Sequence, residues 1–167
     1  MSKTYRVNEC FYSIQGEGVR AGTANVFVRF TGCNLQCSKE PGPKAPGGFD
    51  CDTEFESGRV VTLAELDEWI EAALSSRGDG GGEVRCNWII FTGGEPALQI
   101  DRALIDHLKA QGRMLAIETN GSIELPTGLD WITVSPKVAE HAIKQLTADE
   151  VKYVRGYGQA IPQTVVM

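Results

Sequence analysis

The eight residues VFVRFTGC, Val26 to Cys33, join a strand signal to a reactive side chain. Apart from Arg29, the stretch Val26–Phe30 is β-branched or aromatic, and such a run favours a β-strand. Cys33 follows within three residues of Phe30, so it should lie just beyond the C-terminal end of the strand. Open α/β sheets and barrels place their chemistry at that end of their strands.

The same order, an apolar run followed by a polar or glycine-containing signature, recurs along the chain. Further strands are predicted at Asn87–Phe91, Met114–Glu118, Asp130–Ser135 and Val151–Gly156, and a first alternating segment should end at the turn Gln15–Gly18. Helices are predicted from Thr62, where Glu65 completes a capping box, and from Asp101 to the stop at Gly112. Alternation of strands and helices predicts an α/β fold with parallel strands and right-handed crossovers.

The bulk composition limits the kinds of protein that this chain can be. A chain of 167 residues with 42% hydrophobic and 23% charged residues fits one globular domain, residues 1–167, that needs no disulfide to fold. The net charge of -6 gives no basic footprint for nucleic acid. Neither a signal-peptide pattern nor an apolar run of membrane-spanning length is present, so we expect a cytoplasmic protein without a nucleic-acid or membrane partner.

Three of the five cysteines, Cys33, Cys37 and Cys51, lie close together in the sequence. Between Cys37 and Cys51 lie residues 38–49 and Asp50, and the three prolines and three glycines of residues 38–49 predict an irregular loop inserted into the site. In a reducing compartment such a group favours a metal site over a disulfide, with structural or redox-active cysteines as the alternatives. An iron–sulfur cluster bound by three cysteines keeps one iron open, whereas a closed zinc site would have to recruit a fourth ligand such as Cys10 or Cys86.

Several motifs accompany the cysteines in a fixed order. They are Ser13–Gly18 (SIQGEG), Gly32–Cys37 (GCNLQC), Cys51–Thr53 (CDT), Thr92–Pro96 (TGGEP), Glu118–Gly121 (ETNG) and Ser135–Lys137 (SPK). Each motif alone is weak, but the ordered set resembles the radical S-adenosylmethionine superfamily. Within that superfamily it is similar to the 7-carboxy-7-deazaguanine synthase family.

The resemblance implies an activity and a fold. Such enzymes are lyases that contract 6-carboxy-5,6,7,8-tetrahydropterin to 7-carboxy-7-deazaguanine with release of ammonia, on the path to queuosine and other 7-deazapurines. The implied cofactors are a [4Fe-4S] cluster, S-adenosylmethionine and Mg2+, and the implied partners are an electron donor such as flavodoxin or ferredoxin and a second copy of the chain. The implied fold is a shortened, open TIM-like barrel with outer helices and an expanded cluster-binding loop.

The resemblance also assigns roles to individual residues. It implies that Cys33, Cys37 and Cys51 hold the cluster and that Thr53 supplies an oxygen ligand to magnesium. The implied S-adenosylmethionine contacts are Asp50, Cys51, Asp52, Gly94, Glu95, Glu118, Ser135, Pro136 and Lys137. The implied substrate contacts are Ile14, Gln15, Gly16, Arg29 and Thr92, with the planar fork of Arg29 suited to the pterin carboxylate.

Two features depart from the family pattern. The usual spacing puts two residues between the second and third cysteines, but thirteen separate Cys37 from Cys51. The apolar run Ile161–Met167 has no polar tail, which is typical of a longer domain cut inside an element. The alternatives to this function are a radical S-adenosylmethionine activase acting on a partner protein and a zinc-stabilised, non-enzymatic α/β module.

Overall fold

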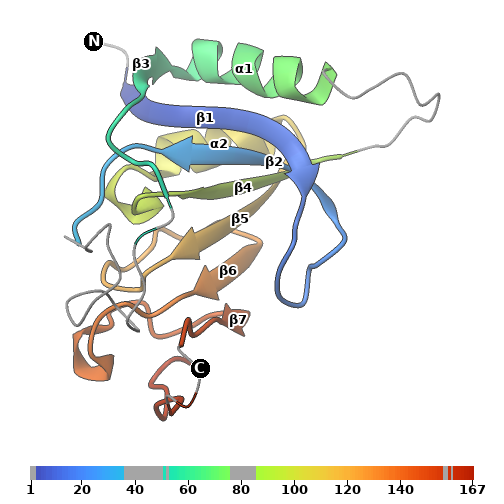
Figure 1. Cartoon of the computed structure of the whole chain (residues 1–167). Helices are drawn as coiled ribbons and strands as arrows, with labels where there is room; N and C mark the ends of the chain where they lie inside the picture. Colours follow the sequence, from blue (N-terminus) through green and yellow to red (C-terminus); the bar gives the residue numbers. More distant parts are fainter. Residues whose placement is uncertain (1–2, 36–50, 52, 76–85, 156–157, 159) are drawn as a thin grey trace.

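The computed structural model contains one seven-stranded sheet with helices on one of its faces (Figure 1). It describes residues 3–35, 51, 53–75, 86–155, 158 and 160–167. The strands are β1 (Thr4–Ile14), β2 (Ala24–Phe30), β3 (Arg59–Thr62), β4 (Trp88–Gly93), β5 (Met114–Thr119), β6 (Trp131–Val134) and β7 (Glu150–Val151). The helices are α1 (Leu63–Ser75), α2 (Arg102–Ala110) and the short 3-10 turns η2 (Pro96–Leu98) and η3 (Glu140–Ala142).

The sheet has the order β3-β1-β2-β4-β5-β6-β7, and β2, β4, β5, β6 and β7 run parallel. This confirms the predicted parallel core and the open barrel, since β3 and β7 stand at the two ends of the sheet without pairing to each other. The first strands differ from the prediction: β1 pairs antiparallel with both β2 and β3. A short loop joins β1 to β2, and so short a connection allows a hairpin but no parallel crossover.

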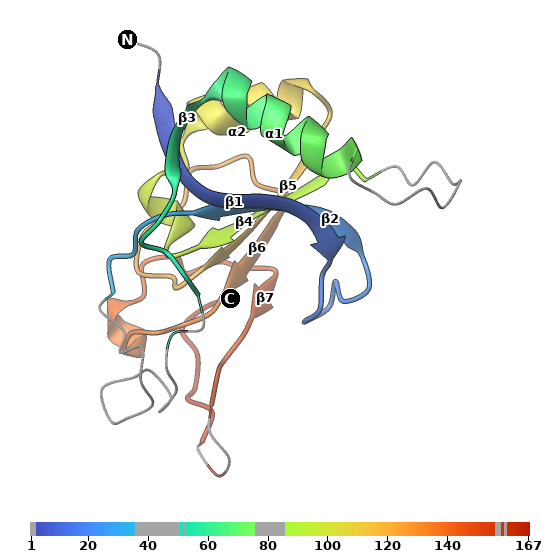
Figure 2. The same cartoon turned by 45° about the horizontal axis from the view of Figure 1, so that its top comes forward.

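The two α-helices begin where the sequence predicts. Thr62 and Glu65 form the capping box of α1: the Glu65 Oε2 accepts from Thr62 N at 2.7 Å, and Glu65 N donates to Thr62 Oγ1 at 3.3 Å. Asp101 caps α2 by accepting from Leu104 N at 2.9 Å. The helices lie side by side on one face of the sheet (Figure 2), where His107 of α2 contacts Asp67 of α1.

The predicted alternation of strand and helix stops after β5. The connection from β5 to β6, residues 120–130, is fully described and contains no helix. It includes Pro126 between the glycines Gly121 and Gly128, both at positive φ, and these residues interrupt a helix. The last strand is also shorter than predicted, since β7 covers Glu150–Val151 and the chain from Lys152 to Arg155 is not in a strand.

The strands turn alternate side chains to two different environments. Val26, Val28 and Phe30 of β2 are at most 1% exposed and belong to the core under the helices. Phe27 and Arg29, the intervening residues, are half-buried and face the other side, the inner face of the curved sheet. The same alternation in β4 and β5 puts Thr92 and Glu118 on the inner face, in the register row that contains Arg29.

No described helix has the length and apolar character needed to cross a membrane.

Candidate active site

A cavity of about 700 Å3 opens on the inner face, at the ends of the parallel strands. Twelve of the residues assigned by the resemblance line it, although they come from segments more than a hundred residues apart. They are Ile14, Gln15, Gly16, Arg29, Cys33, Cys51, Thr53, Thr92, Gly94, Glu118, Ser135 and Lys137. The predicted groups therefore converge on one space.

Two of the three predicted cluster ligands, Cys33 and Cys51, line this cavity. Leu35 N donates to Cys33 Sγ at 3.4 Å, so this thiol accepts a backbone hydrogen bond. The third, Cys37, lies outside the described residues, as do Asp50, Asp52 and the predicted loop 38–49. Among the described residues, which do not include Cys37, no three His, Cys, Asp or Glu side chains are grouped so that they could hold a metal ion.

The other two cysteines belong to the folded core. Cys86 is 8% exposed and its Sγ lies 3.3 Å from the carbonyl oxygen of Ala24. Cys10, on β1, packs against the same core, and burial raises the pKa of its thiol to about 12. Both observations agree with the prediction that these thiols are structural.

The segment around Cys33 is fixed by residues that follow Cys51. Gly32 N donates to the carbonyl oxygen of Phe55 at 2.8 Å, and Thr31 Oγ1 donates to that of Ser57 at 2.7 Å. We call these two contacts the loop stem, because they join the chain on either side of residues 36–50.

The glycines of TGGEP are required by contacts within the protein itself. A Cβ on Gly94 would lie 2.0 Å from the carbonyl oxygen of Gly32, and one on Gly93, at φ +113°, would lie 2.3 Å from that of Phe30. Gly94 N donates to Phe30 O at 3.1 Å and Glu95 N to Gly32 O at 2.9 Å. Both positions therefore require glycine because TGGEP closely approaches the chain before Cys33.

Glu95 is 1% exposed and does not line the cavity. Its carboxylate accepts from Thr119 Oγ1 at 2.6 Å, Asn120 N at 2.7 Å and Ala97 N at 3.0 Å. Burial raises the pKa of Glu95, although the three hydrogen bonds favour the ionised form. Glu95 thus joins the ends of β4 and β5, and Pro136, also buried, likewise lies behind the cavity surface.

Asn120 connects this network to the cysteine segment. Its Nδ2 donates to Asn34 Oδ1 at 3.0 Å, and Asn34 Nδ2 donates to Ser122 Oγ at 2.8 Å. Asn34 directly follows Cys33, so the turn after β5 holds the residue beside a predicted ligand. The motif pattern gave no sign of this contact.

Arg29 has an aromatic neighbourhood that the motifs did not reveal. Its guanidinium carbon lies 5.2 Å from the ring centre of Phe11, which stacks on Phe27 at 5.3 Å between centroids. Arg29 Nη1 also lies 3.8 Å from Glu9 Oε2, a half-exposed pair of a kind that contributes roughly 0–1 kcal/mol. A ligand carboxylate can therefore compete with Glu9 for this guanidinium, above an apolar floor.

Ser135 and Lys137 face the cavity from the end of β6. Lys137 Nζ donates to Ser135 Oγ at 3.0 Å, which places a positive charge and a hydroxyl side by side. An ammonium and a hydroxyl suit the polar end of an amino-acid-containing cofactor.

Comparison with known proteins identifies the family of this chain. Residues 14–154 match the model of the 4Fe-4S single cluster domain. The 7-carboxy-7-deazaguanine synthase of Nitratidesulfovibrio vulgaris is 47% identical over 158 residues, which cover 90% of this chain and 71% of that protein. The chain belongs to the 7-carboxy-7-deazaguanine synthase family.

Other relatives agree. The 7-carboxy-7-deazaguanine synthase of Bradyrhizobium diazoefficiens is 40% identical, with 96% of this chain and 76% of that protein covered. The crystal structure of QueE from Escherichia coli has the same fold, with a TM-score of 0.60 and 22% identity over 90% of this chain and 71% of that one. Membership in the 7-carboxy-7-deazaguanine synthase family confirms the resemblance seen in the motifs.

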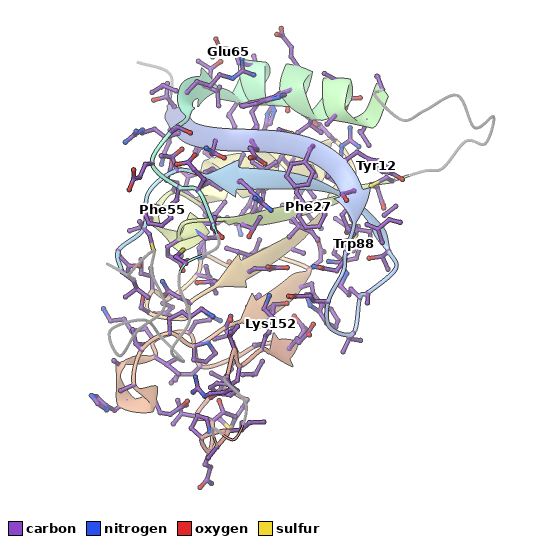
Figure 3. All side chains as sticks on the ribbon, in the orientation of Figure 1. Tyr12, Phe27, Phe55, Glu65, Trp88 and Lys152 are labelled. Carbon is purple, nitrogen blue, oxygen red and sulfur yellow. The ribbon has the colours of Figure 1, made fainter. Side chains whose placement is uncertain are left out.

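The cavity is also lined by residues that the sequence analysis did not assign to the site. These are chiefly Phe11, Phe27, Asn120 and Lys152. Figure 3 labels two of them, Phe27 on β2 and Lys152 just after β7. The period-two alternation of β1 and β2 could have indicated Phe11 and Phe27, because both share a strand face with predicted residues.

Proposed function

We propose that this chain catalyses the radical ring contraction of 6-carboxy-5,6,7,8-tetrahydropterin to 7-carboxy-7-deazaguanine with release of ammonia. The observation that carries the proposal is the convergence of Cys33, Cys51, Arg29 and Glu118 on one cavity of family-specific motif residues. The product feeds the synthesis of queuosine and other 7-deazapurines.

The donor set of the cavity fits an iron–sulfur cluster. Cys33 and Cys51 present soft sulfur ligands to one space, and Cys37 completes the three-cysteine set that leaves one iron open. When bound between these thiols, an iron–sulfur cluster would supply the electron for reductive cleavage of S-adenosylmethionine. The chain itself must hold the reactants in place and keep water away from them.

S-adenosylmethionine would occupy the part of the cavity next to Gly94, Ser135 and Lys137. Lys137 can pair with its carboxylate and Ser135 can bond to its polar groups. The resemblance adds Asp50, Cys51, Asp52, Glu95, Glu118 and Pro136 to this set. Since Glu95 and Pro136 are buried behind the surface, we propose that they act by shaping the turns that contact the cofactor.

The pterin would lie over Phe11 and Phe27, with its carboxylate on Arg29. Stacked aromatic rings give a flat apolar floor for the planar pyrimidine half of the pterin, and Arg29 offers two parallel donors to its carboxylate. Ile14, Gln15, Gly16 and Thr92 complete the substrate contacts. Thr53, which lines the same cavity, would supply a hard oxygen ligand to Mg2+ beside substrate oxygens.

We further propose that residues 1–167 form a single domain with residues 38–49 as an insertion in the cluster loop. The working protein would be a cytoplasmic homodimer that receives electrons from a flavodoxin or ferredoxin and binds neither nucleic acid nor membrane. Size-exclusion chromatography with light scattering tests the dimer, since one copy alone would elute near 18.1 kDa.

The test is anaerobic reconstitution with iron and sulfide, followed by reduction in the presence of S-adenosylmethionine and the carboxytetrahydropterin. We expect 7-carboxy-7-deazaguanine by mass spectrometry, and none when S-adenosylmethionine is left out. A protein with a full cluster that forms no deazaguanine would contradict the proposal. Zinc without iron or sulfide after anaerobic purification would instead support the zinc-module alternative.

A further inference from the structure

Lys152 is the first residue after β7, and its side chain enters the cavity from the side of the sheet farthest from β1. None of the sequence motifs includes it. Its side chain is 27% exposed, so much of the ammonium has exchanged water for protein partners. Such a position requires compensation by opposite charge.

Two carboxylates supply this compensation. Lys152 Nζ lies 2.8 Å from Glu17 Oε2, in the loop between β1 and β2, and 3.5 Å from Glu118 Oε2, on β5. Burial lowers the pKa of Lys152, but the charges of Glu118 and Glu17 outweigh burial and raise it above its usual value. The ammonium is therefore positive at neutral pH, where it balances two acids.

The same acid connects Lys152 to a substrate residue. The other oxygen of Glu118, Oε1, accepts from Gln15 Nε2 at 2.8 Å. Gln15, Glu118 and Lys152 thus form a chain of contacts from the end of β1, across β5, to the end of β7. Because Glu118 is occupied on both oxygens, its carboxylate has a fixed orientation in the cavity.

The tip of the β1–β2 loop is seated on β7 at a second point. Gly18, at φ +69°, lies so near Glu150 that a Cβ would be 1.9 Å from the carboxylate oxygen Oε1. Gly18 and Glu17 therefore bring the loop onto both Glu150 and Lys152. This contact crosses the open side of the barrel, where β1 and β7 belong to different ends of the sheet.

We propose that Lys152 is a positioning residue for the pterin: it fixes the β1–β2 loop and the carboxylate of Glu118 so that Gln15 and Glu118 are ordered before the substrate binds. This inference rests on the proposed function and adds to it a residue and a role. A preordered binding surface lowers the entropy that substrate binding would otherwise cost. Loss of the ammonium would free the loop and leave two carboxylates to repel each other.

The test compares Lys152→Met with Lys152→Arg and with Lys144→Met, an exposed lysine between η3 and β7 in the sequence. We expect Lys152→Met to raise KM for the carboxytetrahydropterin about tenfold while kcat stays within about twofold. The Kd for S-adenosylmethionine, which Glu118 is also proposed to contact, should rise by a smaller factor than this KM. Lys152→Arg should restore most of the affinity, and Lys144→Met should match the unchanged protein. An unchanged KM in Lys152→Met, a loss confined to S-adenosylmethionine, or no rescue by arginine would overturn the proposal.

Hydrogen exchange tests the positioning without any turnover. In the full chain without substrate, amides of residues 15–23 should exchange faster in Lys152→Met than in Lys144→Met. If the unchanged protein forms no deazaguanine, the proposed function fails, but this exchange comparison still decides whether Lys152 orders the loop. If Lys152→Met does not fold, Glu17→Gln replaces it; faster exchange of residues 15–23 supports the proposal, and unchanged exchange overturns it.

Discussion

The two faces of the same strands have different requirements. On β2, Val28 is 0% exposed under the helices, whereas its neighbour Arg29 faces the cavity with its side chain 36% exposed. The outer face supplies the apolar core under the helices, and the inner face combines an aromatic floor with a polar row that includes Arg29, Thr92 and Glu118. In β2, therefore, the even-numbered residues Val26, Val28 and Phe30 stabilise the core, whereas Phe27 and Arg29 are available to bind a ligand.

This difference predicts which property a substitution on each face should change. A change on the outer face removes apolar burial and acts on the free energy of unfolding. A change on the inner face removes a ligand contact and acts on catalysis while the fold persists. Pairs of substitutions, one on each face, can test whether the two faces differ in this way.

The largest expected effect is on the cluster. Cys51→Ala should reduce bound iron and sulfide to background and abolish deazaguanine formation, because a cavity thiolate is lost. Cys86→Ala, a core cysteine, should retain the cluster and lose only some stability. Iron and sulfide analysis with the visible absorption spectrum checks both variants. Cys37→Ala should behave as Cys51→Ala. A full cluster in Cys37→Ala would disprove the assignment of Cys37 as the middle ligand.

The next effect is on stability. Phe91→Ala, on the outer face of β4 at 0% exposure, should lower the free energy of unfolding by about 3–5 kcal/mol. Phe27→Ala, half-buried on the inner face, should cost roughly half as much and instead raise KM for the pterin. Urea denaturation followed by circular dichroism measures the first quantity. Equal losses in the two variants would contradict the division between the faces.

A third substitution isolates charge on the inner face. Arg29→Met should lower kcat/KM about a hundredfold, or roughly 2.7 kcal/mol, because a bidentate partner of the substrate carboxylate is removed. Arg29→Lys should recover part of the loss, since it keeps the charge but not the fork. Arg6→Met, an exposed residue of β1, serves as the control and should change neither kinetics nor unfolding.

The smallest effect concerns a helix end outside the cavity. Asp101→Ala should lower the free energy of unfolding by about 1 kcal/mol, because the cap on Leu104 is lost. Burial raises the pKa of Asp101, but bonds from Lys3, Leu104 and Tyr5 outweigh it and hold the pKa below its usual value. The contribution of Asp101 should therefore be complete above about pH 4 and decline as the pH falls through the lowered folded-state pKa. Urea melts of both proteins at pH 7 and pH 3 would show their difference shrinking, and an undiminished difference at pH 3 would contradict the lowered pKa.

The sequence predicted the parallel strands and both helix starts, because apolar runs and capping residues are local signals. Twelve of the residues that the resemblance assigned line one cavity, since strand ends of a parallel sheet meet at one edge, but Glu95 and Pro136 from the same set lie behind its surface. The sequence did not predict that β1 and β3 run antiparallel, which depends on how Val7 and Tyr5 pair with Arg59 and Val61. Lys152 was missed for the same reason: its partners Glu17 and Glu118 are distant in sequence, and the contact exists only after folding.

The loop stem has a consequence for how much the length of the segment between its two ends can vary. Thr31 and Gly32 are bonded to Ser57 and Phe55, so the two ends of the cluster segment are held at a fixed separation by the folded body. Closing a loop between fixed ends costs only about 0.6 kcal/mol for each doubling of its length. The stem thus makes this segment a place where residues can be added or removed with little loss of fold, which supports the proposal that residues 38–49 are an insertion.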